Sequence, residues 1–380
     1  GYEYSTHRGS TYNSYLINDE KKAIIDVSKA ITGADFLEQA AGMIDLASLD
    51  YIIINHMEPD HSGALQALRR AAPGAQLVGS EKTRKMLESF YGISDNVLVV
   101  KDGDTLALGQ HTLRFISTPN VHWPETIMTY ETLTQTLFCC DAFGSFGALD
   151  GRLFVDQLDN YDAYINEMQR YFVNIIATFR RPVETARGKL ADVPIKLLAP
   201  SHGVLWRQPK DIQRAIDLYR QWVGVGTSGR GQSGITMVYG SMYGNTEKMT
   251  DLVSQGIASE GVPLSVFDVS KVDASYILPP LFLLQGVIIS APTYEGLLFP
   301  TMSALLEMVA TKRIRHKTAG FFGNYGWSGG AKKCVERITE RLKWDLVDTF
   351  EFIGSPSLQD IETGLAFGAS FARRIKEQAA

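Results

Sequence analysis

The stretch HMEPDHSG, residues 56–63, gathers metal-capable side chains directly after the apolar run YIII. These side chains are His56, Glu58, Asp60 and His61. A short apolar run of this kind is typical of a buried strand, so the cluster would lie in the turn at the strand's end. One such histidine would be an ordinary polar residue, but four ligands in one turn can converge on two neighbouring points. The cluster therefore predicts a metal site.

Three further candidates stand at the ends of other β-rich runs. His122 follows the run at residues 113–117, Asp141 comes directly after LFCC, and His202 comes after LLAPS. His61 and His122 are separated by 60 residues, His122 and Asp141 by 18, and Asp141 and His202 by 60. If these strand ends share one edge of a sheet, all the candidates meet there.

A second kind of site is indicated by SMYGNT, residues 241–246, which follows a predicted strand and opens a predicted helix. Hydroxyls, a glycine and backbone N–H groups at a helix N-terminus bind anions such as phosphate. Two more loops, APTYEG at residues 291–296 and NYGWSGG at residues 324–330, also follow strands and combine aromatic with small residues. Such loops suit a flat aromatic ligand.

The elements that position these residues form two series. Strands are predicted at residues 12–17, 23–27, 51–55, 113–117, 136–140 and 197–200, and helices at 63–71, 81–90, 161–177 and 211–222. The glycine-rich stretch at residues 223–234 predicts a linker. After it, strands at 235–240, 264–268, 286–290 and 318–323 alternate with helices at 246–259, 300–310 and 331–342. This alternation predicts a doubly wound parallel sheet that binds its ligand at the carboxyl ends of the strands.

Composition narrows the class of protein. The chain has 380 residues, 45% of them hydrophobic, which fits two globular domains. A net charge of −5 disfavours a nucleic-acid binder. No apolar stretch is long enough to span a membrane and the first residues lack a signal segment, so we expect a cytoplasmic protein. The three cysteines, Cys139, Cys140 and Cys334, are too few for a disulfide framework.

The order H-x-E-x-D-H, then His122, Asp141 and His202 at these separations, resembles the metallo-β-lactamase-fold core of the flavodiiron proteins, whereas SMYGNT is similar to the phosphate loop of flavodoxins. The resemblance covers essentially the whole chain. It implies an α/β protein with a metallo-β-lactamase-like αββα domain at residues 1–228 and a flavodoxin-like FMN domain at residues 229–380. A C-terminal CxxC pair, as in a fused rubredoxin, is absent from these residues.

The resemblance implies FMN contacts from the three loops. The implied residues are Ser241, Met242, Tyr243, Gly244, Asn245, Thr246, Ala291, Pro292, Thr293, Tyr294, Glu295, Gly296, Asn324, Tyr325, Gly326, Trp327, Ser328 and Gly329.

The resemblance also implies how the seven candidate metal ligands divide between two ions. His56, Glu58 and His122 would hold one ion, Asp60, His61 and His202 the other, and Asp141 would bridge them. Zinc hydrolases of the wider fold commonly have histidine where this chain has Glu58. Two imidazoles and a carboxylate on each ion, with no thiolate, suit non-haem iron, so the resemblance implies two iron ions.

The implied activity is the reduction of dioxygen to water, of nitric oxide to nitrous oxide, or of both. Two ferrous ions and reduced FMN together carry the four electrons that one dioxygen needs. The family further implies an external electron donor, either rubredoxin or a reduced deazaflavin coenzyme. It also implies a head-to-tail homodimer or a dimer of dimers, and His7 as a residue that could line the gas pocket.

Two other interpretations stay open from the residues alone. One is a dizinc hydrolase with a regulatory flavin domain. The other is an electron carrier or redox sensor whose metal site is vestigial. Which gas is preferred does not follow from the sequence, because contacts worth about 1.4 kcal/mol change a rate tenfold.

Overall fold

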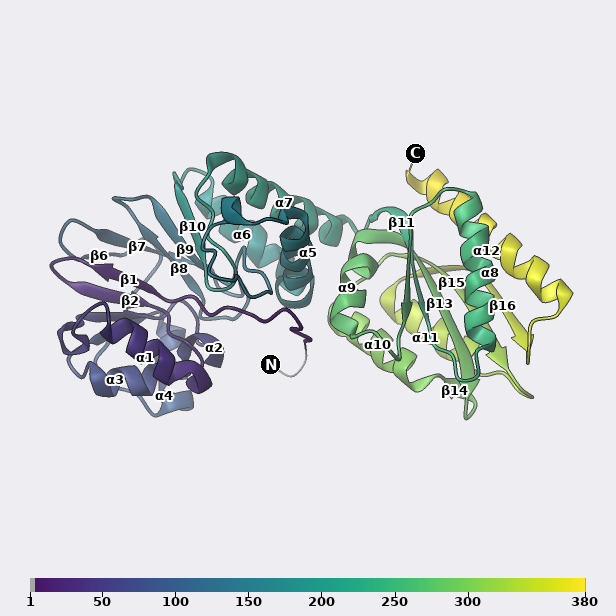
Figure 1. Cartoon of the computed structure of the whole chain (residues 1–380), viewed down its shortest axis with the longest axis horizontal. Coiled ribbons are helices and arrows are strands. Elements are labelled where there is room, and N and C mark those ends of the chain that lie inside the picture. Colours follow the sequence, from purple (N-terminus) through teal and green to yellow (C-terminus); the bar gives the residue numbers. More distant parts are fainter. Residues whose placement is uncertain (1–3, 380) are drawn as a thin grey trace. The chain divides into compact units, whose positions relative to one another are not determined.

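A computed structural model describes residues 4–379 of the chain (Figure 1). The chain divides into two compact units: Thr6–Val223, and a second unit that begins at Gly224 and also includes Tyr4 and Ser5. Within the described residues, no helix has both the length and the apolar character needed to cross a membrane.

Two five-stranded sheets form the centre of the N-terminal unit. In the first sheet the strand order is β1 (Tyr15–Asn18), β2 (Lys22–Ile25), β3 (Tyr51–Ile53), β4 (Gln76–Gly79), β5 (Val97–Val99). In the second sheet the order is β10 (Leu197–Pro200), β9 (Thr136–Cys140), β8 (Ile127–Glu131), β7 (Thr112–Ser117), β6 (Thr105–Ala107). Strands β2 to β5 run parallel, and in the second sheet only β9 and β10 do.

Helices cover both outer faces of this pair of sheets. They are α1 (Gly33–Ala41), α2 (Pro59–Ser62), α3 (Leu65–Ala71), α4 (Glu81–Tyr91), α5 (Tyr161–Tyr171), α6 (Arg180–Leu190) and α7 (Pro209–Ser228). Short 3₁₀ turns lie at Ala30–Thr32, Leu46–Ser48, Val155–Gln157 and Ala177–Phe179, and a π-helical turn lies at Phe172–Ile176. The predicted αββα layering is confirmed.

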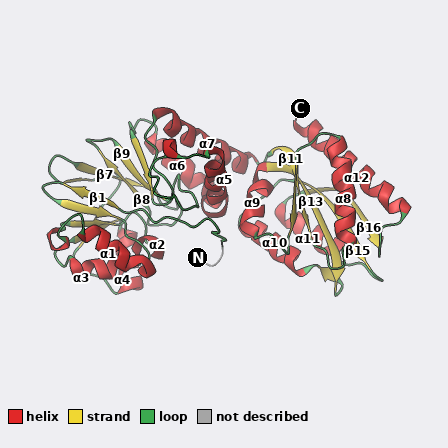
Figure 2. Ribbon diagram, in the orientation of Figure 1, coloured by secondary structure: helices red, strands yellow, loops and turns green. Residues whose placement is uncertain are grey.

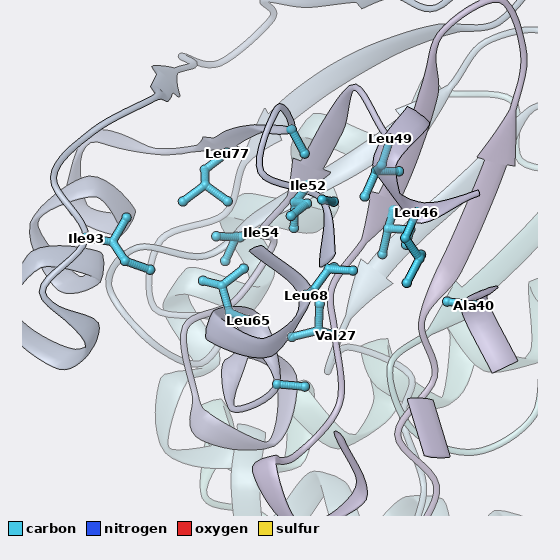
Figure 3. Packing of buried hydrophobic residues seen from close by; sticks show 14 of the residues in the cluster. Val27, Ala40, Leu46, Leu49, Ile52, Ile54, Leu65, Leu68, Leu77 and Ile93 are labelled. Atoms are coloured by element: carbon cyan, nitrogen blue, oxygen red, sulfur yellow. The ribbon is translucent and has the colours of Figure 1, made fainter. Parts of the chain in front are cut away.

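Two buried clusters hold the layers together because side chains alternate between the faces of each strand. Ile52, Leu77 and Leu65 belong to the cluster between the first sheet and its helices (Figure 3). Ile53 and Phe115 belong to the cluster between the two sheets. The centre of this unit is therefore a sheet-on-sheet core.

The C-terminal unit is built on one parallel sheet. Its order is β12 (Leu264–Asp268), β11 (Gln232–Tyr239), β13 (Leu284–Tyr294), β15 (Thr318–Tyr325), β16 (Asp345–Ile353), and the short β14 (Leu297–Leu298) pairs antiparallel with β13. Its helices are α8 (Asn245–Ser259), α9 (Ala274–Leu283), α10 (Pro300–Thr311), α11 (Ala331–Leu342) and α12 (Leu358–Ala379). Helices and strands alternate through it (Figure 2), and the predicted doubly wound, flavodoxin-like sheet is confirmed.

Helices α8 and α12 pack closely on one side of this sheet (Figure 1). A Cβ atom at Gly256 would collide with the Leu365 carbonyl oxygen, and one at Gly368 with the Val253 carbonyl oxygen. Glycine destabilises a helix interior by about 0.5–1 kcal/mol, so these two positions are explained by the close approach of the helix backbones.

The linker prediction at residues 223–234 is wrong in extent. Helix α7 continues through Gly224 and Gly226 to Ser228, and β11 already begins at Gln232. Extending a formed helix fixes few additional torsions for each hydrogen bond gained, so two glycines do not stop it. The helix ends where Gly229 adopts φ +67°, which leaves only residues 229–231 as a loop.

Several elements were not predicted, namely strands β4, β5, β6, β8, β14 and β16 and helices α1, α2, α9 and α12. Strands β4, β5 and β6 have only three or four residues, too few for a periodic pattern. Helix α9 contains Pro279 and Pro280, which normally signal the end of a helix. The predicted helix at residues 161–177 is α5 followed by the π-helical turn and the start of a 3₁₀ turn.

Candidate metal centre and flavin site

Four chain segments of the N-terminal unit bring the predicted metal ligands together. His56 and the turn after it follow β3, and His122 lies between β7 and β8. Asp141 directly follows β9, and His202 comes two residues after β10. Because β9 and β10 are parallel neighbours, with Pro200 opposite Cys140, their carboxyl ends place Asp141 and His202 side by side.

The structure places all seven side chains in two adjacent groups. One group contains His56, Glu58, His122 and Asp141, and the other contains Asp60, His61 and His202. Within each group the candidate ligand atoms lie within 4.8 Å of one another.

Asp141 connects the groups through its two carboxylate oxygens. Oδ2 lies 3.0 Å from Nε2 of His122 and 3.5 Å from Nε2 of His56. Oδ1 lies 3.0 Å from Nε2 of His61 and 3.4 Å from Nε2 of His202. Each oxygen therefore faces a pair of imidazoles.

The two terminal carboxylates are placed beside the same pairs. Oε2 of Glu58 lies 3.0 Å from Nε2 of His122 and 3.3 Å from Nε2 of His56. Asp60 lies 3.5 Å from both His61 and His202, through one oxygen for each. Each group thus contains two imidazoles and its own carboxylate, with Asp141 between them.

Two of the four rings are oriented by their other nitrogen. Nδ1 of His56 is 2.7 Å from Oε1 of Glu125, and Nδ1 of His202 is 2.6 Å from the carbonyl oxygen of Thr11. A hydrogen bond from Nδ1–H leaves Nε2 as the nitrogen that faces the centre, where it can bind a metal ion once it has lost its proton.

Charge within the centre is strongly coupled. Burial alone would raise the pKa of Asp141, but the surrounding His61, His122 and His202 lower it well below its usual range. Burial opposes protonation of His61, whereas Asp141 and Asp60 raise its pKa to about 9. The carboxylates likewise raise the pKa of His122, against the effect of burial. A cation bound among these side chains would replace the protons on His61 and His122.

The hydrogen-bond pattern fits a metal site. Among the described residues, Oδ1 of Asp60, Nε2 of His61, Nε2 of His122 and Oδ1 of Asp141 are buried atoms without a hydrogen-bond partner. Buried polar atoms are nearly always satisfied, so a group of unsatisfied ones that face each other needs an explanation. Imidazole nitrogens and carboxylate oxygens directed at a common point are the donor set of a transition-metal ion.

The loop around Asp141 is conformationally constrained. Cys140 and Phe143 have φ values of 55° and 65°, in the left-handed region that non-glycine residues seldom adopt. Gly203, directly after His202, has φ 81°, and a Cβ atom there would collide with the Tyr164 hydroxyl. Strained non-glycine backbone, as at Cys140 and Phe143, concentrates at functional sites.

One side of the centre is open and the other is closed. The side chains of His56 and His61 are fully buried and that of Asp141 is 1% exposed, whereas that of Glu58 is 37% exposed. His7 is exposed, and it belongs to neither group of metal-capable residues in the described chain. Its placement in a gas pocket stays a prediction.

Sequence patterns did not identify several residues that support the centre. Glu125 also accepts a hydrogen bond from the Met57 N–H at 2.9 Å, and Asp26 accepts one from the Asn55 N–H at 2.8 Å. Thr11 contributes only a backbone carbonyl, so its side-chain type gives no signal. Of these supporting residues, only Glu125 could have been noticed in the sequence, because it is a carboxylate three residues after the predicted ligand His122.

The three predicted flavin loops lie together in the C-terminal unit. The first follows β11. The other two were predicted to start too early, because residues 291–294 still belong to β13 and residues 324–325 to β15. The carboxyl ends of these three strands share one edge of the parallel sheet. A cavity of about 350 Å³ lies there, lined by residues from every loop. Of the predicted residues, Ser241, Gly244, Ala291 and Gly329 do not line it, whereas Gly354, which was not predicted, does.

This cavity has the features of a flavin site. Helix α8 begins at Asn245 beside it, and the Ser241 hydroxyl accepts a hydrogen bond from the Gly244 N–H at 3.1 Å. Tyr243 and Trp327 are 87% and 93% exposed at its rim. Large aromatic side chains this exposed around a cavity are expected where a flat ligand stacks.

All three cysteines are free. Cys139 and Cys140 are the last two residues of β9 and are buried, whereas Cys334 in α11 is half-buried. No thiol belongs to either metal-capable group among the described residues.

Comparison with known proteins matches each half of the chain to a family. Residues 11–203 match the ODP family beta lactamase, and residues 237–368 match flavodoxin. The computed structure resembles the rubredoxin oxygen:oxidoreductase from Desulfovibrio gigas with a TM-score of 0.93 and 28% identity, covering 99% of this chain and 93% of that one. It resembles the flavodiiron protein from Giardia intestinalis with the same score and identity, over 100% and 92% of the two chains.

Sequence comparison gives the same relationship. The chain is 36% identical to the anaerobic nitric oxide reductase flavorubredoxin of Salmonella paratyphi A, over 98% of this chain and 78% of the relative. It is 37% identical to the protein of the same name from Aeromonas hydrophila, over 90% of this chain and 68% of the relative. Both halves are matched in order, and the chain belongs to the flavodiiron protein family.

Proposed function

We propose that this protein is an oxidoreductase that reduces dioxygen to water, nitric oxide to nitrous oxide, or both, at two iron ions that receive electrons from FMN. The observation that carries the proposal is the position of Asp141. Its two oxygens each face a different pair of histidines, with closest distances of 3.0 Å on both sides. A carboxylate so placed suits a bridge between two metal ions.

In this proposal His56, Glu58 and His122 hold one iron, and Asp60, His61 and His202 hold the other. The resulting set of two imidazoles, one terminal carboxylate and a shared carboxylate for each ion is supported by the distances around Asp141. Such mixed nitrogen and oxygen ligation leaves positions open for a gas on non-haem iron. Glu58 is the residue that most favours iron over the zinc of related hydrolases.

When bound, iron and FMN would supply the electrons that the gas takes up. The protein itself orients the ligands. Glu125 and the Thr11 carbonyl hold the rings of His56 and His202, while the fully buried side of the centre keeps water away from His61. Preorganised ligands keep the reacting positions fixed without reorganisation during turnover.

FMN would occupy the cavity at the sheet edge of the C-terminal unit. Ser241 to Thr246 and the N-terminus of α8 would bind its phosphate, because helix N-terminal N–H groups attract anions. Tyr294 and Trp327 would stack on its ring system, as their exposure beside the cavity supports.

The test is anaerobic turnover of the reduced, metal-loaded protein, with dioxygen and nitric oxide supplied separately. We expect consumption of at least one gas, iron at about two ions per chain and FMN at about one. Two zinc ions without iron would instead favour the dizinc hydrolase, and iron and FMN without any gas turnover would favour an electron carrier.

The electron donor we propose is rubredoxin, with a reduced deazaflavin coenzyme as the alternative. The name of the Desulfovibrio gigas neighbour, rubredoxin oxygen:oxidoreductase, supports the first. Reduction of the protein-bound FMN by each donor, followed by its absorbance, distinguishes them.

We also propose residues 1–228 and 229–380 as the two domains, because α7 ends at Ser228 and the loop at residues 229–231 follows. Electron transfer between flavin and metal would occur across a head-to-tail homodimer, alone or as a dimer of dimers. A cytoplasmic location remains our prediction.

A further inference from the structure

The N-terminal unit has a cavity that is lined in part by residues next to His122 and Asp141 in the sequence. Its volume is about 530 Å³, and it lies between the second sheet and helices α6 and α7. The sheet contributes Met128, Leu137 and Leu198, which point away from the sheet-on-sheet core, and the helices contribute residues such as Ala186 and Ile216. Most of its lining is apolar.

The charged residues of the cavity lie at its edge and have partners there. Arg187 forms an ion pair with Glu184 at 2.8 Å, and Arg220 forms one with Asp217 at 2.7 Å. The arginines and Glu184 are partly or largely exposed. Because no buried charged side chain lines the cavity among the described residues, its interior suits an uncharged ligand.

Part of the cavity lining comes from residues that adjoin two metal-centre residues in the sequence. Val121 directly precedes His122, and Ala142 and Phe143 directly follow Asp141. Val121 and Ala142 are buried and have small side chains. The same two backbone segments therefore line the cavity and carry metal-centre side chains.

We propose that this cavity takes up the apolar diatomic gas, dioxygen or nitric oxide, and delivers it to the metal centre past Val121 and Ala142. The delivery step rests on the proposed function; uptake of an apolar gas does not. Apolar walls hold water weakly and favour atoms or molecules that need no hydrogen bonds. Side-chain motions on the picosecond-to-nanosecond scale would let a diatomic molecule pass small residues.

This route differs from the open side of the centre at Glu58. That side presents carboxylates, which hold water, whereas the cavity presents aliphatic carbon. Gas would thus approach from one side, and water would exchange at the other.

Xenon tests uptake directly, because it occupies apolar cavities and takes no part in catalysis. We expect crystals of the metal- and flavin-loaded protein, pressurised with xenon, to show an atom among Leu137, Ala186 and Ile216. Ala186→Phe should exclude it by filling the space, and Ile216→Phe, from the opposite wall, gives a second variant if the first folds poorly. Thr185→Phe is the matched control, since Thr185 is exposed on the same helix.

Kinetics test delivery. Both filling variants should lower kcat/KM for the gas by about threefold or more, with kcat at saturating gas, iron and FMN contents unchanged. Thr185→Phe should have no effect on these values.

No xenon in the wild-type cavity would overturn uptake. Xenon bound in the wild type with unchanged kcat/KM in both filling variants would overturn delivery and assign gas entry to the side at Glu58. If the wild type consumes neither gas, both the proposed function and the delivery of gas to the metal centre are wrong. The xenon experiment still decides whether the cavity takes up an apolar gas.

Discussion

Asp141 is the residue at which the two halves of the metal centre meet. Its carboxylate is 1% exposed and lies within 3.5 Å of all four histidine Nε2 atoms. A buried anion placed this way is stable only beside positive charge. Without metal, the raised pKa values of His61 and His122 favour protonated rings that supply this charge, and in the loaded protein the metal would supply it.

Replacing this residue should disrupt metal binding. We expect Asp141→Ala to lose one or both ions, because each would lose the ligand that they share. Metal content per chain after purification and iron loading measures the loss. Asp156→Ala, which removes a carboxylate paired with Arg207 elsewhere in the same unit, is the control. Full iron content with normal turnover in Asp141→Ala would rule out the bridge.

Glu125 should act through His56. Its hydrogen bond at 2.7 Å orients the imidazole, and partners of this kind typically contribute about 10- to 100-fold in metal affinity or activity. We expect Glu125→Gln to lower metal affinity by this factor, measured by competition with a chelator. Glu184→Gln, near the surface, should leave affinity unchanged. Equal affinities for both variants would show that Glu125 does not position His56.

At this scale, the type and spacing of residues in the sequence predicted which side chains the structure brings together. His56, His122, Asp141 and His202 stand at strand ends and could be identified one by one. Thr11 and Asp26 could not, because their roles depend on which distant segments come together, and Thr11 acts through its backbone.

Among the elements, the edge of the C-terminal sheet opposite the flavin loops contains a buried lysine. Lys317 precedes β15, is 3% exposed, and donates hydrogen bonds to the carbonyl oxygens of Phe282 and Leu284 at 2.7 and 2.8 Å. Burial lowers the pKa of Lys317 to about 7.

This shift makes stability depend on pH. Between pH 7 and 10.5 the unfolded chain holds a proton on Lys317 that the folded chain does not, so stability rises with pH in that window. We expect Lys317→Met to remove this dependence, a change on the order of several kcal/mol across the window. Urea unfolding of both proteins at pH 7, 8.5 and 10 measures it.

Lost hydrogen bonds to the two carbonyls would shift the stability of Lys317→Met equally at every pH. Only a difference in the slope of unfolding free energy against pH therefore reports on the protonation of Lys317. Lys333→Met, on the exposed face of α11, should follow the wild-type curve. Parallel curves for Lys317→Met and the wild type would show that Lys317 remains charged when folded.

The loops at the flavin edge give another element-scale prediction. Trp327→Ala should weaken FMN binding by about 2- to 10-fold, because stacking of aromatic groups contributes about 0.5–1.5 kcal/mol. Fluorescence titration of flavin-free protein with FMN measures this. Leu358→Ala, which removes an 83% exposed apolar side chain in the same unit, is the control. An unchanged dissociation constant would exclude Trp327 from the binding site.

Success in predicting elements did not simply follow length, because helix α12 with 22 residues and strand β16 with nine were both missed. Helix α11 and strand β12 match their predicted bounds, because each has a clear periodicity and flanking turn residues. Helix α7 was predicted too short and α9 was not predicted, since Gly224, Gly226, Pro279 and Pro280 are normally helix breakers. In α9 local propensity was outweighed by burial of neighbouring side chains such as Leu278 and Leu281, whereas α7 continues because extending a formed helix costs little.

For the whole molecule, the two functional sites belong to separate compact units. If the flavin of one chain serves the metals of another, activity requires association. We expect turnover per chain to fall when the protein is diluted until monomers dominate, measured together with mass by light scattering. Iron and FMN contents per chain, which need only one unit each, should stay constant. A fully active monomer would contradict the head-to-tail dimer.

A protein that handles dioxygen or nitric oxide places its own sulfur atoms at risk of oxidation and nitrosation. Both reactions favour the thiolate form of cysteine. Burial raises the pKa of Cys139 and of Cys140 well above the usual range. These two thiols remain protonated beside the centre, so the strand that carries the shared carboxylate is protected from damage by the substrates it helps to consume.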